Sequence, residues 1–559
     1  WDTLIELASE LQGFPKYLMQ PSGGMIISSD PLINMVPVQP GGMDDRYICH
    51  WDRDSVADAN FVKIDFLALG ALSQMQEALQ LIEEHKGEFL DLSRIDFDDQ
   101  RVYASIHKAD TIGIFQVESA AQMQTVVRLR PQNLNEMAYE VAAVRPGVGV
   151  NNGVSQFIER YRHNVKVEYV HNREIPALER TLGIILFQDQ VNELAVHVAG
   201  FGLKKADDLR RAFGRKNNEG LLKQYWDDFR EGAAVNEVPE EAAKKIFGKF
   251  SGQYMFPESH AYAFGITAYQ MAWMKYYYPL EFYVAIFNQQ PMGFYNLETL
   301  KEDAKRHGIK VLNPDINESM AKSTIRNEDS FILGLLSVNG LGTANVDAII
   351  EARERGGRFL SLADAMRHMG LRRQAIESLI TAGAFDSLVL DRRSALWEVG
   401  LLYRPIGAQQ ALALPVGQDM VNLPLMTDWE TMLGEYRTMG VHPDGHFMAY
   451  LREHLSGDIT LSQDVADLEE GTRVSVAGLV IRRQHPGANA VFITLEDEFG
   501  HIPLVVWPQV FDRYRLVIRE PVLKVDGFVS RRDGALNVVV KHAEGVSFHQ
   551  PLPPSKNWG

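Results

Sequence analysis

The sequence lacks the cysteine content of a disulfide-stabilised protein, because Cys49 is its single cysteine. One thiol cannot form an internal disulfide, and this composition is typical of a reducing cytoplasm. No apolar run approaches the roughly 18–20 residues that span a bilayer, so we expect a cytoplasmic protein with no membrane partner. The chain begins at Trp1 without a charged and apolar leader, which indicates a processed chain or a fragment.

The chain also lacks an excess of basic residues, since its net charge is −17. This acidic balance excludes a protein that coats nucleic acid over its whole surface. It does not exclude an enzyme that acts on nucleic acid, because phosphate contact requires only a local basic surface. Hydrophobic residues make up 46% and charged residues 23%, as in ordinary globular proteins, and 559 residues allow roughly three to five domains.

Periodicity and turn signals divide the chain into segments of different character. Short apolar strands extend to about residue 70, and helical spacing dominates residues 71–313. Two short helix–turn units follow within residues 333–388, and residues 401–424 have the composition of a linker. No repeat of fixed period is present, which excludes a solenoid. We therefore predict an α+β multidomain protein.

The last domain is predicted to be a small β-barrel. Strand-length runs of Val and Ile, separated by turns, fill residues 472–548 and surround one helix-like segment at Val510–Val517. Five such strands around a helix indicate an OB fold. The Pro-rich tail, residues 551–559, is expected to be flexible.

The first candidate site lies on a strand near residue 64. Val62, Ile64 and Phe66 are expected to face a core, which places Lys63 and Asp65 together on the other face. A carboxylate on a rigid strand binds a divalent cation, and a neighbouring ammonium meets phosphate. Alternatively, both side chains form an ordinary solvated face.

The densest basic element is Lys204–Lys216. In a helix, Arg211 and Arg215 lie one turn apart, a like-charge arrangement that an anion such as a triphosphate or a DNA backbone would stabilise. The alternative is that Asp207 pairs with Arg211 across the same turn. That pairing would leave three cations unmatched, namely Arg210, Arg215 and Lys216.

Ser259 and His260 form a polar cluster where an apolar helix is expected to begin. Ser259 is a candidate helix cap, and a single histidine is more often structural than functional. No second His or Cys lies at ligand spacing, so we do not expect a zinc site.

Two further segments are candidates for DNA contact. Asn339, Gly340 and Gly342 precede a helix predicted at Ala344–Arg353, as in a helix–hairpin–helix whose backbone N–H groups approach a DNA phosphate. An ordinary tight turn is the alternative. The predicted barrel carries the basic and aromatic mixture of single-strand binders, although Phe492 also suits a core. These barrel residues are Arg482, Arg483, Phe492, Trp507, Arg513, Arg531 and Arg532.

Six motifs occur in a fixed order: Pro21–Ile27, Val62–Leu67, Gly113–Ser119, Val144–Gly147, Gly183–Gln190 and Leu209–Gly214. Their order, continued by Ser259-His260, the hairpin and the barrel, resembles that of the bacterial C-family DNA polymerases, the DNA polymerase III alpha subunits. Four segments resemble the error-prone branch, with the replicative branch as the alternative. They are Phe256–His260, Asn288–Tyr295, Phe492–Glu498 and Leu504–Pro508.

The resemblance implies a domain order. The expected domains are the end of the thumb and the remainder of the palm (1–70), fingers (71–330), a helix–hairpin–helix region (331–400), a linker with small helices (401–470), an OB domain (471–550) and a flexible tail (551–559).

The resemblance also implies roles for single residues. Asp65 matches the third metal-binding carboxylate of the palm, and Lys63 matches a phosphate-contacting lysine. Arg210 and Arg211 match residues that hold the incoming triphosphate. Arg215 and Lys216 lie near them, and Ser259 and His260 match a motif that lines the nucleotide pocket. The implied reaction is attack of a primer 3′-hydroxyl on the alpha-phosphate of a deoxynucleoside triphosphate with two Mg²⁺ ions.

Three departures from the family limit these expectations. The other two palm carboxylates and the amino-terminal PHP domain are expected upstream of Trp1, so this chain alone is predicted not to polymerise. Pro21 stands where many relatives carry a histidine. Gln409 and Leu412 have the spacing of a sliding-clamp peptide but lack its aromatic end, and the segment suits a plain linker equally.

The expected partners are primer–template DNA, deoxynucleoside triphosphates and polymerase accessory proteins such as a sliding clamp. A competing hypothesis of another class is a non-catalytic single-stranded DNA-binding protein built from the helix–hairpin–helix and OB units.

Overall fold

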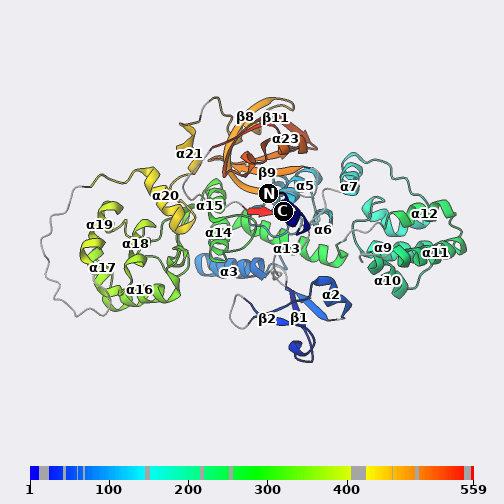
Figure 1. Ribbon diagram of the computed structural model, residues 1–559, viewed down its shortest axis with the longest axis horizontal. Coiled ribbons are helices and arrows are strands. Elements are labelled where there is room, and N and C mark those ends of the chain that lie inside the picture. Colours follow the sequence, from blue (N-terminus) through cyan, green and yellow to red (C-terminus); the bar gives the residue numbers. More distant parts are fainter. Residues whose placement is uncertain are drawn as a thin grey trace. The chain divides into compact units, whose positions relative to one another are not determined.

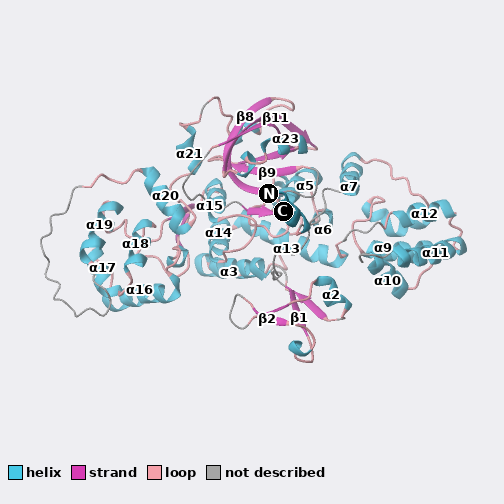
Figure 2. Cartoon of the chain, viewed as in Figure 1, coloured by secondary structure: helices cyan, strands magenta, loops and turns pink. Residues whose placement is uncertain are grey.

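The structure is a computed structural model, and Figure 1 shows its elements in chain order. It describes residues 1–11, 24–41, 46–59, 61–66, 69–144, 152–213, 219–250, 256–403, 423–455, 457–484, 490–546 and 556–558. The chain forms two compact units, Trp1–Ser73 and Gln74–Gly559. Helices dominate residues 69–465, and the longer strands belong to the C-terminal domain (Figure 2). The predicted α+β class is confirmed.

The first unit contains short elements connected by turns. Its strand β1 pairs antiparallel with β4, and this register places Gly24 opposite Asp65 and Ile26 opposite Lys63. The two strands predicted here are therefore present. The unit's elements are α1 (Asp2–Glu10), β1 (Gly24–Ile27), β2 (Val38–Pro40), β3 (Tyr47–Cys49), α2 (Arg53–Asp58) and β4 (Val62–Asp65).

The apolar face of the β1–β4 pair is not a buried core, which corrects the prediction. Val62 is 60% exposed, Ile64 37% and Phe66 45%. Met25 and Ile27 stand opposite Ile64 and Val62, and both are also exposed. Strand alternation sorts residues between two faces but does not supply the layer that covers either face.

The second unit begins with a large helical region. Its helices pack closely. For example, a Cβ atom added to Gly265 would lie only 3.1 Å from the backbone nitrogen of Ala138. The helices are α3 (Leu69–Lys86), α4 (Gln100–His107), α5 (Ala120–Leu129), α6 (Leu134–Ala143), α7 (Asn152–His163), α8 (Ile175–Leu178), α9 (Asp189–Ala199), α10 (Leu203–Phe213), α11 (Glu219–Val235), α12 (Glu240–Gly248), α13 (Glu258–Tyr277), α14 (Pro279–Asn288) and α15 (Leu297–Arg306).

A small three-stranded sheet follows the helical region and was not predicted. Strand β7 lies in its centre, parallel to β5 and antiparallel to β6. The strands are too short for their alternation to be distinguished from loop sequence. The elements from here to the barrel are β5 (Lys310–Leu312), β6 (Thr324–Asn327), β7 (Ser330–Ile332), α16 (Gly342–Gly356), α17 (Leu362–Met369), α18 (Arg373–Thr381), α19 (Arg392–Leu402), α20 (Asp428–Met439), α21 (Phe447–Arg452) and α22 (Ser462–Val465).

The C-terminal domain is the predicted OB barrel. Its strands follow the order β8–β9–β10–β12–β11, and pairing of β11 with β8 closes the barrel. Among these five described barrel strands, β10 and β12 are the one parallel pair. The helix expected at Val510–Val517 begins earlier, because a proline favours the first helical position. The elements are β8 (Arg473–Gln484), β9 (Val491–Glu496), β10 (His501–Val506), α23 (Pro508–Tyr514), β11 (Val522–Arg532) and β12 (Ala535–Gly545).

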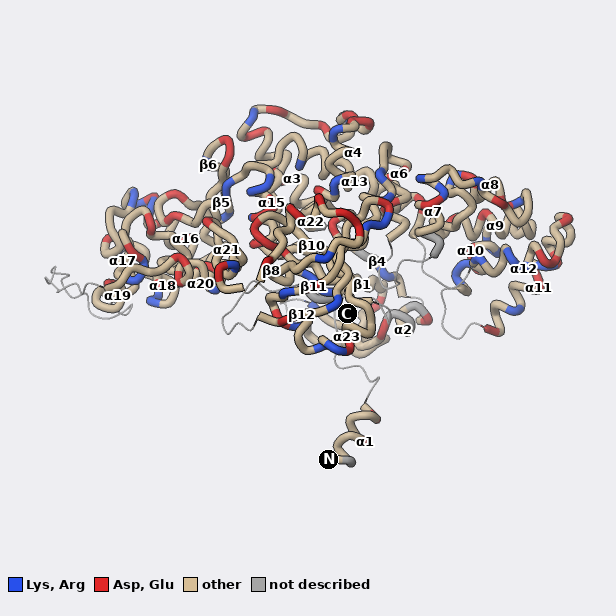
Figure 3. The backbone as a smooth tube through the Cα atoms, turned by 90° about the horizontal axis from the view of Figure 1, so that it is seen from above, with Lys and Arg blue, Asp and Glu red and all other residues tan. Residues whose placement is uncertain are grey.

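Three described residues of the tail form a strand. Strand β13 (Lys556–Trp558) pairs parallel with β8 at Arg482–Gln484. Most of the predicted linker, including Gln409 and Leu412, lies outside the described residues. No helix in the described part of the chain is long and apolar enough to cross a membrane. Acidic and basic residues are interspersed along most of the chain (Figure 3).

Candidate nucleotide and DNA site

Helix α10 carries the first candidate residues, Arg210 and Arg211, and Asp207 pairs with both. Nε and Nη2 of Arg210 donate to Asp207 Oδ1 at 3.0 and 2.8 Å, and Nε of Arg211 donates to Asp207 Oδ2 at 2.8 Å. The hydrogen bond from Arg210 is the main reason that the pKa of Asp207 is lowered. The pairing of Asp207 with Arg211, which was the alternative to an anion site, is present. Arg210 shares the same carboxylate, whereas that alternative left it unmatched. Two guanidinium groups therefore share one negative charge, which leaves a net positive charge for an anion.

The exposed fractions of these side chains differ. Arg210 is 25% exposed, whereas Arg211 is 65% exposed and faces solvent. Arg215 and Lys216 lie outside the described residues, so the like-charged face expected at Arg211 and Arg215 stays a prediction.

Helix α13 begins one residue before Ser259, and its cap differs from the one predicted. The cap position is Pro257, and the first helical N–H, that of Glu258, donates to Asp189 Oδ2 at 2.7 Å. Ser259 is therefore not the cap, and its side chain is exposed. An acidic partner at this end also compensates the helix dipole.

His260 packs between two aromatic rings. Its ring centroid lies 5.0 Å from that of Phe256 and 3.9 Å from that of Phe264. Burial lowers the pKa of His260, which favours the neutral imidazole. The histidine therefore offers a hydrogen-bonding edge and an apolar surface rather than a positive charge.

The segment Gly183–Gln190 connects α10 with the start of α13. Gln188 Oε1 accepts a hydrogen bond of 2.9 Å from Arg210 Nη1, and the backbone N–H of Gln188 donates to Phe256 O at 3.0 Å. The structure thus brings Arg210 next to the segment that leads into Ser259 and His260. Lys63 and Asp65 lie on β4, in the other compact unit.

The helix–hairpin–helix turn has the backbone that the glycines predict. Gly340 and Gly342 have φ of +79° and +70°, and both are exposed where α16 begins. The N–H of Asn339 donates to Thr438 O at 2.7 Å, so a backbone hydrogen bond joins the hairpin to α20. A Cβ atom on either glycine would meet no neighbouring atom within 4 Å. The backbone conformation, rather than space, requires glycine here.

We predict that Gly340→Val lowers the affinity for duplex DNA roughly fivefold, because about 1–2 kcal/mol of strain opposes the left-handed turn. Fluorescence anisotropy with a labelled duplex measures this affinity. Gly356→Val is the matched control, since Gly356 also lies in open space but lacks a positive φ. Equal affinity of the two variants would contradict a role for the hairpin.

Two of the barrel arginines are not available to DNA, which corrects the prediction. Arg482 is only 2% exposed, with its guanidinium 4.8 and 5.0 Å from the ring centroids of Phe294 and Tyr295. Arg483 Nε donates to Ile518 O at 2.7 Å, and its Nη2 donates to Glu520 O. Stacking on two aromatic rings holds the Arg482 guanidinium inside the protein, although its Nε and Nη2 have no hydrogen-bond partner among the described residues. Backbone carbonyls hold Arg483.

The remaining barrel residues differ in exposure. Arg531 donates to Leu468 O at 2.9 Å, so part of its guanidinium is engaged. Arg532, Arg513 and Trp507 are exposed, whereas Phe492 is half-buried. The exposed residues stay candidates for contact with DNA.

Burial of Arg482 belongs to a larger contact between the barrel and the helical region. Arg128 Nε on α5 donates to Asp533 Oδ2 at 2.9 Å, and Gln124 Nε2 donates to Asn537 Oδ1 at 2.6 Å. On α15, the Thr299 hydroxyl donates to Glu496 Oε2 at 2.8 Å. Polar groups on two helices therefore hold the barrel.

Glu118 gives this contact a pH dependence. Burial raises the pKa of Glu118 from 4.5 to about 7, although Arg482 opposes the shift. Because the folded pKa exceeds the unfolded one, this contribution to stability is complete below about pH 4.5 and is lost as pH rises through about 7. In the wild type, this group should lower the unfolding free energy by about 3 kcal/mol between pH 5 and 8. We expect Glu118→Gln not to show this pH-dependent fall.

Denaturant unfolding of the wild type and of Glu118→Gln at several pH values measures this difference. The gap in unfolding free energy between the two proteins should change across the range. A gap that is the same at pH 5 and pH 8 would contradict the assignment.

One cluster of potential metal ligands is present among the described residues: Asp110, Asp303 and His307. Lys275 Nζ lies 2.7 Å from Asp110 Oδ1 and 2.7 Å from Asp303 Oδ2. The lysine ammonium therefore supplies the positive charge, and the cluster is a buried ion-pair network rather than a metal centre.

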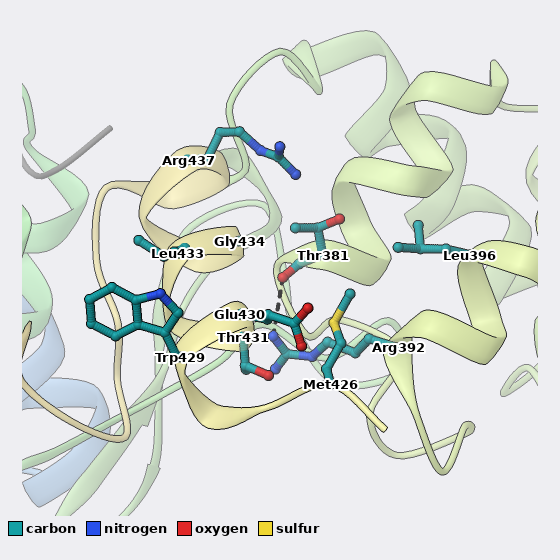
Figure 4. Close-up of a pocket in the computed structure, with 10 residues that line it drawn as sticks. All are labelled: Thr381, Arg392, Leu396, Met426, Trp429, Glu430, Thr431, Leu433, Gly434 and Arg437. Carbon is teal, nitrogen blue, oxygen red and sulfur yellow. Dashed lines mark hydrogen bonds between the residues drawn. The ribbon is translucent and has the colours of Figure 1, made fainter. Parts of the chain in front are cut away.

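A pocket of about 390 Å³ lies between α20 and the helices α18 and α19 (Figure 4). The dashed line in the figure is the hydrogen bond from Arg392 Nη1 to Thr381 O, 3.1 Å long. The pocket contains no residue of the predicted nucleotide or DNA sites. Its lining residues are Thr381, Arg392, Leu396, Met426, Trp429, Glu430, Thr431, Leu433, Gly434 and Arg437.

Comparison with known families matches most of these regions. Residues 71–237 match the bacterial DNA polymerase III alpha subunit finger domain, and residues 1–68 match the bacterial DNA polymerase III alpha NTPase domain. Residues 308–395 match a helix-hairpin-helix motif, and residues 474–544 match an OB-fold nucleic acid binding domain.

Whole-chain comparison finds relatives named error-prone DNA polymerase. The one from Sinorhizobium medicae is 37% identical over 584 residues, which covers 97% of this chain and 52% of the relative. That from Mycolicibacterium paratuberculosis is 36% identical over 549 residues, covering 96% and 50%. The chain belongs to the bacterial C-family of DNA polymerases, in its error-prone branch. It spans about half the length of the curated relatives it matches.

The C-family assignment explains the order of motifs but not every residue that the structure brings together. Gln188 contacts α10 and Asp189 contacts the first residue of α13, yet the sequence predicted no role for either residue. Their only signal was membership of the Gly183–Gln190 motif, whose spacing does not reveal which elements it joins.

Proposed function

We propose that this chain is the fingers, helix–hairpin–helix and OB part of an error-prone DNA-directed DNA polymerase that acts across damaged templates. The observation that most strongly supports this proposal is that Arg210 and Arg211 lie on α10, next to the segment that leads into α13, in a chain of the C-family. The net positive charge of this arginine pair suits a triphosphate.

In this proposal, Arg210 and Arg211 hold the phosphates of the incoming deoxynucleoside triphosphate, and Asp207 releases part of its bonding to them. Arg215 and Lys216 extend the same basic segment. Neutral His260 and the Ser259 hydroxyl line the nucleotide pocket, where a ring face and a hydroxyl can contact base and sugar.

Asp65 would hold a divalent cation, which we propose is Mg²⁺, and Lys63 would meet phosphate. The donor set of this chain does not fit two ions, because β4 supplies a single carboxylate to the proposed centre. When bound, two Mg²⁺ ions align the attacking and leaving oxygens in such reactions. The missing carboxylates are proposed to lie in the segment that corresponds to the other half of the relatives. We call the protein containing both parts the intact polymerase.

The proposed partners are primer–template DNA and deoxynucleoside triphosphates in a cytoplasmic enzyme. Gly340 and Gly342 contact duplex phosphates through backbone N–H groups, and Asn339 contacts them through its exposed side chain. The exposed Arg532 and the partly engaged Arg531 contact single-stranded template. A sliding clamp or another accessory protein is a further proposed partner, with Gln409 and Leu412 as its peptide.

Primer extension tests the proposal. The intact polymerase, supplied with primer–template, Mg²⁺ and deoxynucleoside triphosphates, should extend the primer and also incorporate opposite a template lesion. DNA binding without extension would instead support a non-catalytic binding module. Clamp pull-down by wild-type protein, lost in a Gln409→Ala, Leu412→Ala variant, tests the accessory contact separately.

A further inference from the structure

Gln188 occupies the point where the two proposed nucleotide-binding elements meet. Its side-chain carbonyl accepts from Arg210 Nη1 at 2.9 Å, while its backbone N–H donates to Phe256 O at 3.0 Å. The residue thus contacts α10 through its side chain, and through its backbone it contacts Phe256, two residues before α13. Phe187 and Phe256 form a parallel bridge at the same place.

The two partners of Arg210 have different charges. Asp207 is anionic, and it divides its carboxylate between Arg210 and Arg211. The amide of Gln188 is neutral, so its hydrogen bond fixes the direction of one guanidinium edge without neutralising the positive charge. An arginine that must bind a triphosphate benefits from such a partner, because its orientation is set before binding while its charge stays available.

The backbone around Gln188 is itself held firmly. Gln190 is buried, and its Oε1 accepts from the N–H groups of Leu186 and Phe187 at 2.8 and 3.0 Å. The next residue along from Gln188, Asp189, accepts the first N–H of α13 at 2.7 Å. A rigid segment therefore fixes both the Gln188 amide and the start of α13.

A pair of ion pairs also connects the start of α13 to the same segment. Arg180 Nη2 lies 2.8 Å from Glu258 Oε2 and 2.8 Å from Glu193 Oε1. Glu193 belongs to α9, the helix that begins at Asp189, and Glu258 is the first residue of α13. Displacement of α13 would therefore also disturb Gln188.

We propose that Gln188 is a positioning residue. It orients Arg210 toward the triphosphate and fixes the position of Arg210 relative to Ser259 and His260. This inference rests on the proposed function of Arg210. Gln188 acts through Arg210 and touches no reacting atom, so it sets the affinity for the nucleotide rather than the chemistry of the transfer.

Two substitutions in the intact polymerase separate position from charge. Gln188→Ala removes the hydrogen bond and should raise the apparent dissociation constant for the deoxynucleoside triphosphate roughly tenfold. Gln188→Glu keeps nearly the same shape but adds a carboxylate that competes with phosphate for Arg210. It should weaken nucleotide binding at least as much, whereas a purely packing role predicts wild-type affinity for the glutamate variant.

A double-mutant cycle shows whether the effect passes through Arg210. Single-turnover incorporation with varied triphosphate gives the dissociation constant and the maximal rate for wild type, Gln188→Ala, Arg210→Ala and the double variant. We expect Gln188→Ala to weaken binding in the wild-type background and to add little when Arg210 is already alanine. Gln270→Ala is the matched control, because Gln270 is also half-buried and donates one bond, to Leu92 O at 3.0 Å.

The outcomes are distinguishable. If Arg210→Ala leaves the triphosphate affinity unchanged, the proposed function of α10 fails. If Arg210→Ala weakens binding but the Gln188 variants behave like Gln270→Ala, the positioning role alone is overturned. Additive losses in the double variant would also overturn it, because they would show that Gln188 acts independently of Arg210.

Discussion

Replacing Asp65 with asparagine in the intact polymerase is expected to lower the maximal rate of nucleotide incorporation by about 10²–10³-fold. Asparagine preserves the size of the side chain and one carbonyl oxygen but removes the negative charge that a divalent cation requires. Backbone groups pair β4 with β1, and the substitution leaves these groups in place, so the local fold should persist. Rapid-quench incorporation at saturating triphosphate and Mg²⁺ measures the rate.

Asp58→Asn is the matched control for this variant. Asp58 is an exposed residue of α2 in the same unit, and it belongs to no candidate site. We expect its incorporation rate to equal that of the wild type. An Asp65→Asn enzyme as fast as Asp58→Asn would remove Asp65 from the proposed metal site.

Replacing Arg210 or Arg211 with alanine is expected to weaken triphosphate binding by about 10–100-fold, since each removes a charge-assisted contact with phosphate. Removing Arg210 also frees Asp207 to bind Arg211 alone, so the loss should exceed that of one hydrogen bond. Affinity for primer–template should change much less. Single-turnover kinetics give the triphosphate affinity, and anisotropy gives the DNA affinity.

Lys205→Ala is the control on the same helix. Lys205 Nζ pairs with Asp228 Oδ2 at 2.8 Å and lies 4.5 Å from the centroid of the Phe201 ring. The substitution therefore removes a cation that lies outside the proposed site. A loss of triphosphate affinity equal to that of Arg210→Ala would indicate a general electrostatic effect rather than a specific contact.

Patterns local in sequence predicted the corresponding parts of the fold. Strand-length apolar runs and turns predicted the OB barrel, because inward and outward residues alternate along its strands. The positions of Gly340 and Gly342 predicted the hairpin, since few other residues adopt its left-handed backbone. The exposure of Val62 and Ile64 was not predictable, because alternation does not reveal whether a covering layer is present.

Contacts between segments distant in sequence explain the errors at the candidate sites. Arg482 has the sequence signature of a DNA-binding residue, but its burial depends on Phe294 and Tyr295, which belong to another domain. The spacing on α10 gave the pairing of Asp207 with Arg211 as one of two alternatives, whereas the contact of Gln188 with Arg210 requires the tertiary fold.

Primer extension on one template by the 559-residue chain alone and by the intact polymerase is the most direct measurement. Both proteins receive the same primer, Mg²⁺ and deoxynucleoside triphosphates. The account predicts that the intact polymerase extends the primer and that the chain alone binds DNA but leaves the primer unextended. Extension by the chain alone, or none by the intact polymerase, would contradict it.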